Sequence, residues 1–443
     1  MADKRNRTRR DNRSLIMDYA ATLSSTGLIS LIGVITGVLT ARLLGPAGKG
    51  DLATIFWLPG LLTTAAILAL PQAVAFQVSR NQESHKIMTA VGFWLGLFWG
   101  LLLAAVLYPF IPQILGNSKI YLTKISRWYL LYLPIAFSGL TLLGVDQGRQ
   151  AFLRYNLLRL LPAVFFFIAL VIVWLIQKVD LNTIVMSNLL AQLLATLIRG
   201  VAAGKALFTN SSHNWITTVK QLLKTGMVFH LPDLAGIVLL RMDMAMLIHM
   251  VSAKEIGFYS VATAISIGQI GVVTSVVQVG FPKLVKYKGM DALPALLKQF
   301  RLVQPMVLST ALLVALFTPW IIRYLFGPEF QPAVIPTFIL IMAIALWGLK
   351  QVLDNGLRAM GYGMPGTIAN GMGLVVLVLT GYTLTHSYGI IGMATGVLIS
   401  QGLTCVILLI ILRKKVAKYS WKNIFGFNMH SFHEIRSAFK KKA

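Results

Sequence analysis

The chain has only one cysteine and few acidic residues. Cys405 is the single cysteine among 443 residues, and 14 Asp and Glu stand against 40 Lys and Arg. One cysteine excludes an intramolecular disulfide, a CxxC redox pair and a zinc site built from cysteines. Charged residues make up only 12% of the chain, too few to cover the surface of a soluble protein of this length.

Motifs of the common enzyme classes are also missing from the sequence. It contains no Walker phosphate-binding loop, no HExxH zinc motif and no nucleophile elbow. The loops predicted on the outer side are about 15 residues or shorter, which leaves little room for a catalytic domain. We therefore expect a protein that is not an enzyme and that needs neither a cofactor nor a metal.

What the sequence does contain is about twelve long apolar segments. A lipid hydrocarbon core about 30 Å thick requires about 20 apolar residues for each helical crossing. We therefore predict an all-α polytopic membrane protein. The predicted helices span residues 15–43, 51–78, 87–112, 128–152, 157–176, 181–207, 222–250, 257–281, 302–326, 334–360, 367–386 and 389–412.

Basic residues are distributed unevenly around these segments. A hydrophilic arm at residues 1–14 and a tail at residues 414–443 are both rich in Lys and Arg. An N-terminus in the cytoplasm would put about 31 of the 40 basic residues on the cytoplasmic side, in agreement with the positive-inside rule. We expect a multi-pass protein of the cytoplasmic membrane with both termini in the cytoplasm. The formal charge of +26 then indicates contact with anionic membrane lipids and not with nucleic acid.

The segments form two sets of six that resemble each other weakly. Gly50 and Gly257 each follow a short outer turn and are expected to open the second and the eighth helix. Because six helices separate the copies, both halves should have the same orientation, related by a pseudo-two-fold axis along the membrane normal. The predicted parts are an N-lobe at 15–208, a cytoplasmic linker at 209–221 and a C-lobe at 222–413, flanked by the basic arm at 1–14 and the tail at 414–443.

The seventh segment, 222–250, is the apolar helix richest in ionisable residues. A charge that faces lipid at the centre of the bilayer costs about 2.5–3.5 kcal/mol, so such residues should face a cavity or one another. In a continuous helix His230 and Arg241 share a face, with Asp233 beside them, and Asp243 follows Arg241. This wall could hold an anionic group. Alternatively, Arg241 and Asp243 pair with lipid headgroups or a neighbouring helix, and His230 is only hydrogen-bonded.

The tenth segment carries Lys350, Asp354 and Arg358 at a spacing of four residues. This spacing places the three charges on one face of a helix. Lys350 and Asp354 are candidates for a cavity lining, but an ion pair within the helix explains them equally well.

In the second segment Gln72 directly follows Pro71, and Gln77 lies five positions later. That spacing rotates the two side chains about 140° apart, so at most one of them should reach a cavity. We select Gln72 as a ligand for sugar hydroxyl groups. Hydrogen bonding across helices is the alternative for either residue.

Several short motifs resemble a known family. The turn at residues 41–50, the sequence Leu70-Pro71-Gln72, the Arg241-x-Asp243 pair and the sequence Gly257-Phe258-Tyr259-Ser260 are similar to those of bacterial polysaccharide-biosynthesis flippases. These form the Wzx-like group of the MATE/lipid-flippase superfamily. The resemblance implies a MATE-like fold of two six-helix lobes around a cationic cavity. By position, Arg241 carries over best as a cavity cation and Arg42 more weakly.

The function that this resemblance implies is transport of a lipid. We predict a flippase that moves undecaprenyl-diphosphate-linked oligosaccharide from the inner to the outer leaflet by alternating access, with polysaccharide polymerase machinery as a candidate partner. A cation-coupled exporter of drugs or metabolites is the alternative. In that case Asp233 would bind Na⁺ or H⁺. A third hypothesis is a membrane-bound glycan polymerase or ligase. Such an enzyme would need an outer catalytic loop, which we do not find in the sequence.

Overall fold

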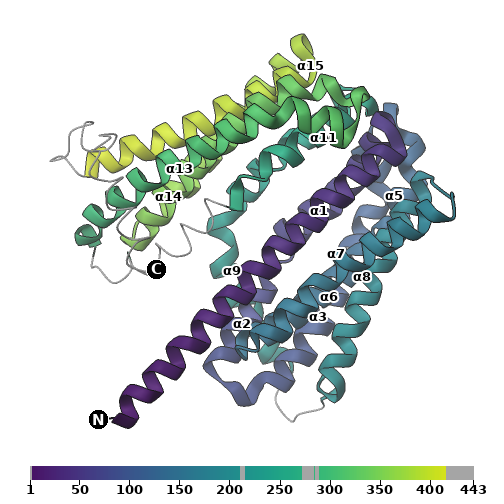
Figure 1. The fold of residues 1–443 in the computed structure, drawn as a ribbon. Helices are drawn as coiled ribbons and strands as arrows, with labels where there is room; N and C mark the ends of the chain where they lie inside the picture. Colours follow the sequence, from purple (N-terminus) through teal and green to yellow (C-terminus); the bar gives the residue numbers. More distant parts are fainter. Residues whose placement is uncertain (1, 210–214, 272–283, 285–288, 416–443) are drawn as a thin grey trace. The chain divides into compact units, whose positions relative to one another are not determined.

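The computed structural model describes residues 2–209, 215–271, 284 and 289–415 (Figure 1). Within these ranges the chain is helical and contains no strand. Each of the twelve predicted segments coincides with at least one helix, so the all-α prediction is confirmed. Seven helices of the described residues are long and apolar enough to cross a membrane, or eight when one bent pair is counted as a single span. Of the predicted tail, 414–443, residues 416–443 lie outside the described residues.

The chain divides into two compact units. Unit 1 comprises Met1–Ile237 and Ser252–Gly257, and unit 2 comprises Val238–Val251 and Phe258–Ala443. The division between Ile237 and Val238 therefore falls in the middle of the predicted seventh helix, 222–250, and not at the predicted linker, 209–221. The structure has a helix from Trp215 onward, and this helix packs with unit 1.

The helices of unit 1 are α1 (Ala2–Ala65), α2 (Leu70–Arg80), α3 (His85–Leu107), α4 (Ile111–Leu115), α5 (Thr123–Tyr129), α6 (Tyr132–Gly148), α7 (Phe152–Leu175), α8 (Leu181–Ala203) and most of α9 (Trp215–Leu239). Short 3-10 turns at Gln82–Ser84 (η1), Tyr108–Phe110 (η2), Asn117–Leu122 (η3) and Gly204–Phe208 (η4) connect them. Residues 2–14, predicted as a separate arm, continue α1 as helix.

The helices of unit 2 are α10 (Met242–Met250), most of α11 (Ala253–Ile267), α13 (Leu293–Trp320), α14 (Val334–Ala359) and α15 (Met364–Lys415). A π-turn at Ile321–Phe326 (η6) and 3-10 turns at Gly289–Ala292 (η5) and Pro328–Ala333 (η7) join or precede them. The predicted eighth helix is described only to Gly271, since residues 272–281 lie outside the described part.

Two of the predicted turns are reduced to single glycines. α1 combines the first helix and part of the second, and its one non-helical residue is Gly45, with φ of 66°. α15 combines the last two helices across Gly389, with φ of 57°. These left-handed backbone angles suit glycine because it has no Cβ. A sharp change of direction therefore takes one residue where the sequence predicts a loop.

The predicted second helix is not continuous. α1 ends at Ala65 and α2 starts at Leu70, and between them Leu68 and Ala69 have φ of 57° and 49°. Residues with a side chain seldom adopt such angles, which cost of order 1–3 kcal/mol each. The break exposes main-chain carbonyl groups at the end of α1, and two side chains satisfy them. Trp99 Nε1 donates to the oxygen of Ala66 at 2.7 Å, and His230 Nε2 lies 2.8 Å from the oxygen of Ala65.

The predicted seventh helix is also broken. α9 ends at Leu239, α10 starts at Met242, and Arg241 between them has φ of −128° and ψ of −5°. The prediction that His230 and Arg241 share a helix face is wrong, because it assumed eleven continuous helical residues. The two residues belong to different units.

Candidate functional site

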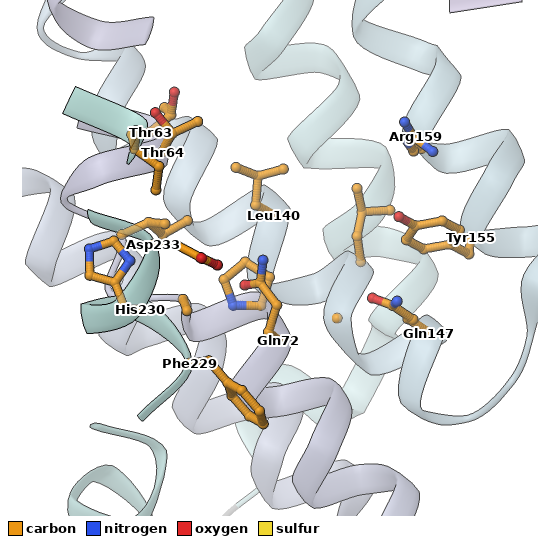
Figure 2. Close-up of a pocket in the computed structure, with 16 residues that line it drawn as sticks. Thr63, Thr64, Gln72, Leu140, Gln147, Tyr155, Arg159, Phe229, His230 and Asp233 are labelled. Atoms are coloured by element: carbon orange, nitrogen blue, oxygen red, sulfur yellow. The ribbon is translucent and has the colours of Figure 1, made fainter. Parts of the chain in front are cut away.

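A cavity of about 630 Å³ lies within unit 1 and gathers polar side chains from five segments (Figure 2). A larger hollow of about 810 Å³ also lies in unit 1, but polar groups form a smaller part of its lining. We take the polar cavity as the candidate site. It is lined by Thr63 and Thr64 of α1, Ile67 and Ala69 of the break, Pro71 and Gln72 of α2, Leu140, Leu143, Gly144 and Gln147 of α6, Tyr155 and Arg159 of α7, and Phe229, His230, Asp233 and Ile237 of α9.

The break between α1 and α2 places Gln72 in this cavity. Pro71 occupies the first turn of α2, where its missing N–H costs no hydrogen bond. Gln72 is exposed, whereas Gln77 is buried. The amide of Gln77 is occupied in the interior, since Gln77 Nε2 donates to Thr225 Oγ1 at 2.8 Å and Gln77 Oε1 accepts from Gln221 Nε2 at 2.8 Å. The two glutamines thus point to different surroundings, as their spacing predicts.

α9 contributes His230 and Asp233 to the same cavity. His230 is only 5% exposed. Because a carbonyl oxygen can only accept, the contact of 2.8 Å with Ala65 requires a proton on Nε2 of the imidazole. Asp233 lies one turn further along and is exposed. In Figure 2 its carboxylate and the amide of Gln72 both point into the middle of the hollow.

The opposite wall carries a cation that the sequence analysis did not select. Arg159 of α7 lines the cavity together with Tyr155 and Gln147 (Figure 2). Its Nη1 donates to Thr26 Oγ1 of α1 at 3.3 Å, and its guanidinium carbon lies 6.0 Å from the centre of the Tyr155 ring. In the sequence analysis Arg159 counts only among the basic residues expected on the cytoplasmic side. The signal was present, because Arg159 lies inside the apolar segment 157–176, where a charge must face a polar surrounding.

Four of the predicted site residues lie in unit 2, apart from the lining of this cavity. Asp243 Oδ2 accepts a hydrogen bond of 2.7 Å from the hydroxyl of Tyr259. Lys350 Nζ donates to Asn370 Oδ1 at 2.8 Å. Lys350 and Asp354 are 2% and 3% exposed, so both are packed in the interior of unit 2.

Asp354 has a partner in its own helix. Its carboxylate is 3.1 Å from Nη2 of Arg358, four residues later in the same helix. The helical spacing allows such an ion pair. Arg241 stands at the break between α9 and α10 in unit 2, and Arg42 is exposed in α1 of unit 1. Neither residue is among those that line the cavity.

The lining therefore combines one guanidinium, one carboxylate, one imidazole and several uncharged hydrogen-bonding groups. An arginine binds phosphate and carboxylate oxygens through paired N–H donors. Amide and hydroxyl groups both donate and accept hydrogen bonds, as the hydroxyl groups of sugars do. Arg159 and Asp233 give the lining no net formal charge with His230 neutral, so the arrangement suits a polar molecule whose anionic group lies at Arg159.

Solved structures show the same fold. The lipid II flippase MurJ in an inward closed conformation matches with a TM-score of 0.74 and 14% identity over 97% of this chain and 93% of that chain. A multidrug resistance MATE transporter in an inward-facing conformation matches with a TM-score of 0.72 and 16% identity. The match covers 88% of this chain and 94% of that chain. A MOP superfamily transporter from Pyrococcus furiosus matches with a TM-score of 0.63 and 15% identity. The match covers 90% of this chain and 94% of that chain. These likenesses confirm a MATE-like, multi-pass membrane fold.

Sequence comparison identifies the family. No curated protein sequence matches the chain significantly. A family model described as "Polysaccharide biosynthesis protein" matches residues 15–288, which is more than half of the 443 residues. The chain therefore belongs to the polysaccharide biosynthesis protein family, and it has the fold of the flippase and MATE transporter structures.

Proposed function

We propose that this protein is a flippase that carries undecaprenyl-diphosphate-linked oligosaccharide from the inner to the outer leaflet of the cytoplasmic membrane by alternating access. The observation that supports this proposal most directly is the cavity in unit 1. It places one guanidinium, from Arg159, beside uncharged groups that can bind sugar hydroxyls. Membership of the polysaccharide biosynthesis protein family agrees with such a substrate.

Arg159 is the residue that we assign to the diphosphate. A phosphate group that leaves water loses its hydration, and a charged hydrogen bond to a guanidinium recovers part of this cost. Thr26 and Tyr155 hold the guanidinium from two sides, so little side-chain freedom is lost when it binds. This preorganisation favours binding of an anion.

The sugars are assigned to the other polar groups of the lining. The side chains of Gln72, Gln147 and Tyr155 can each donate and accept hydrogen bonds. Thr63 and Thr64 lie at the end of α1, next to the break, and their hydroxyl groups donate to carbonyl oxygens of their own helix. Their oxygens can still accept a hydrogen bond from a sugar.

The membrane potential supplies a driving force for this transport. Each elementary charge that crosses a potential of 100 mV changes its free energy by about 2.3 kcal/mol. Two negative charges on the diphosphate would move downhill toward the outside of a cell with a negative interior. Co-transported cations would cancel this contribution.

The test is transport of a fluorescent undecaprenyl-diphosphate saccharide by the full-length protein in vesicles, read as the fraction of label that becomes accessible to a quencher in the outer leaflet. We expect Arg159→Ala to slow transport at least about tenfold, which corresponds to one charged hydrogen bond. Arg159→Lys should retain part of the rate. Lys178→Ala, which removes an exposed charge just beyond α7, is the control. Normal transport by Arg159→Ala would refute the site assignment.

Asp233 favours a second candidate, a cation-coupled exporter of drugs or metabolites. Its carboxylate is the only acidic group in the described lining of the cavity, and such a group can bind Na⁺ or carry H⁺. In this case a proton or sodium gradient should drive efflux of a dye from cells that lack other pumps. Asp233→Asn should abolish that efflux. Efflux without any effect on lipid-linked saccharides would decide for the exporter.

A further inference from the structure

A second, smaller pocket in unit 1 is strongly basic. It has a volume of about 200 Å³ and lies where the start of α3, the end of α6, the start of α7 and the end of α8 come together. Its lining includes four cations and one carboxylate, a formal charge of +3 with His85 neutral. The lining comprises His85, Lys86, Thr89, Leu142, Val145, Asp146, Arg149, Arg154, Leu158, Arg199, Ala202, Ala203 and Ala206.

Arg199 is a buried cation of this pocket, and it is only 2% exposed. Its Nε and Nη2 donate to the carbonyl oxygen of Leu158 at 3.2 and 2.9 Å. Its Nη1 has no hydrogen-bond partner among the described residues. Gly139 leaves the room that this group occupies, since a Cβ there would lie 2.8 Å from Nη1. A buried guanidinium with an unused donor is costly unless an anion compensates it.

The carboxylate of the pocket does not serve as this anion. Asp146 is 3.2 Å from Nε of Arg154, and Arg154 Nη2 also donates to the carbonyl oxygen of Ala202 at 2.6 Å. This ion pair joins α6 to α7 and neutralises one cation. In the described part of the chain Lys86 and Arg149 form no salt bridge, and both are exposed. The pocket thus has a buried cation, Arg199, together with two exposed cations that remain available to a ligand.

We infer that this basic pocket, separate from the candidate transport cavity, binds a phosphate group. Sites for drug-sized ligands usually measure about 300–1,000 Å³, so the pocket suits a small anion and not an oligosaccharide. Arginine and lysine side chains are the usual partners of phosphate, and basic pockets between transmembrane helices commonly bind phospholipid headgroups. His85 and Lys86 stand in the first turn of α3, where the helix dipole also favours a negative charge.

The phosphate could come from an anionic phospholipid or from solution, and one experiment separates these sources. Full-length protein in a neutral detergent is titrated with a fluorescent short-chain phosphatidylglycerol, and separately with inorganic phosphate at constant ionic strength. We expect saturable binding of at least one of them. If the lipid binds and inorganic phosphate does not displace it, the pocket is a site for a lipid headgroup. Binding of phosphate alone identifies a site for the dissolved ion.

The double variant Lys86→Gln/Arg149→Gln removes only exposed charges, so it should fold. We expect it to weaken binding about tenfold or more, because two cationic donors to the phosphate are lost. Lys178→Gln/Lys220→Gln removes two exposed charges elsewhere in unit 1 and should bind normally. Equal loss in both double variants, or no binding of either probe by the wild-type protein, would overturn the inference. The readout is binding, so the outcome does not depend on whether the proposed transport is correct.

Discussion

The imidazole of His230 lies 2.8 Å from the main-chain oxygen of Ala65, 165 residues earlier in the chain. It satisfies a carbonyl group that α1 exposes where it ends, and so ties α9 to the break in the predicted second helix. The candidate cavity lies at this junction. The hydrogen bond supports the structural interpretation of His230 that the sequence analysis left open.

His230→Ala should therefore lower the stability of the protein. It removes the hydrogen bond to the partly buried carbonyl group of Ala65, which costs about 0.5–1.5 kcal/mol, and thermal unfolding in detergent would show this. His230→Gln keeps an N–H donor and should recover part of the loss. If both variants unfold at the wild-type temperature but fail to transport the lipid-linked saccharide, His230 acts on the substrate and the structural interpretation is wrong.

Gly50 and Gly257 provide a second test of packing. Each lies one turn after the start of its helix and not at its first residue as predicted, since the backbone break is at Gly45 and α11 starts at Ala253. A Cβ on Gly50 would overlap the carbonyl oxygen of Ala253, and one on Gly257 that of Pro46.

We expect Gly50→Ala and Gly257→Ala each to cost about 1–3 kcal/mol through overpacking, seen as a lower temperature of unfolding. Gly60→Ala is the matched control. It lies in the same helix, α1, with nothing within 4 Å of the added Cβ, so it should be neutral or stabilising by up to about 1 kcal/mol. Equal effects at positions 50 and 60 would contradict the close packing.

Substitutions at the two glutamines of α2 should have different effects, one on stability and the other on substrate binding. Gln77→Ala removes two hydrogen bonds to α9 and should lower the unfolding temperature. Gln72→Ala changes an exposed cavity residue. It should leave stability unchanged and weaken binding of the saccharide by about 0.5–1.5 kcal/mol. Comparison of unfolding and substrate titration for both variants checks this, and the reverse pattern would refute the placement of Gln72 in the site.

The expected orientation in the membrane can be tested with cysteines, because Cys405 is the only native one and is buried. In a Cys405→Ser background, a cysteine at Lys178 should react with an impermeant thiol reagent added to intact cells. A cysteine at Glu83 should react only after the cells are opened, since the positive-inside rule places residues 80–86 in the cytoplasm. Labelling of Glu83→Cys from outside would reverse the predicted topology.

Much of the fold could be predicted from the sequence. A helix long enough to cross a bilayer depends on the run of apolar residues in one stretch of chain, so all twelve predicted segments coincide with helices. The separation of Gln72 from Gln77 was predictable for the same reason, because it depends only on the helical repeat. The predicted shared face of His230 and Arg241 failed because that helix is interrupted between them.

The sequence by itself determined the membrane class, the helical segments and the family resemblance, all of which depend on local composition or on short motifs. Only the tertiary structure decided which polar groups meet. Leu68 and Ala69 do not themselves favour a left-handed backbone, and Pro71 is compatible with a helix start but does not dictate the break that positions Gln72. Arg159 faces the cavity because α7 packs against α1 and α6, and such contacts join residues that lie far apart in the chain.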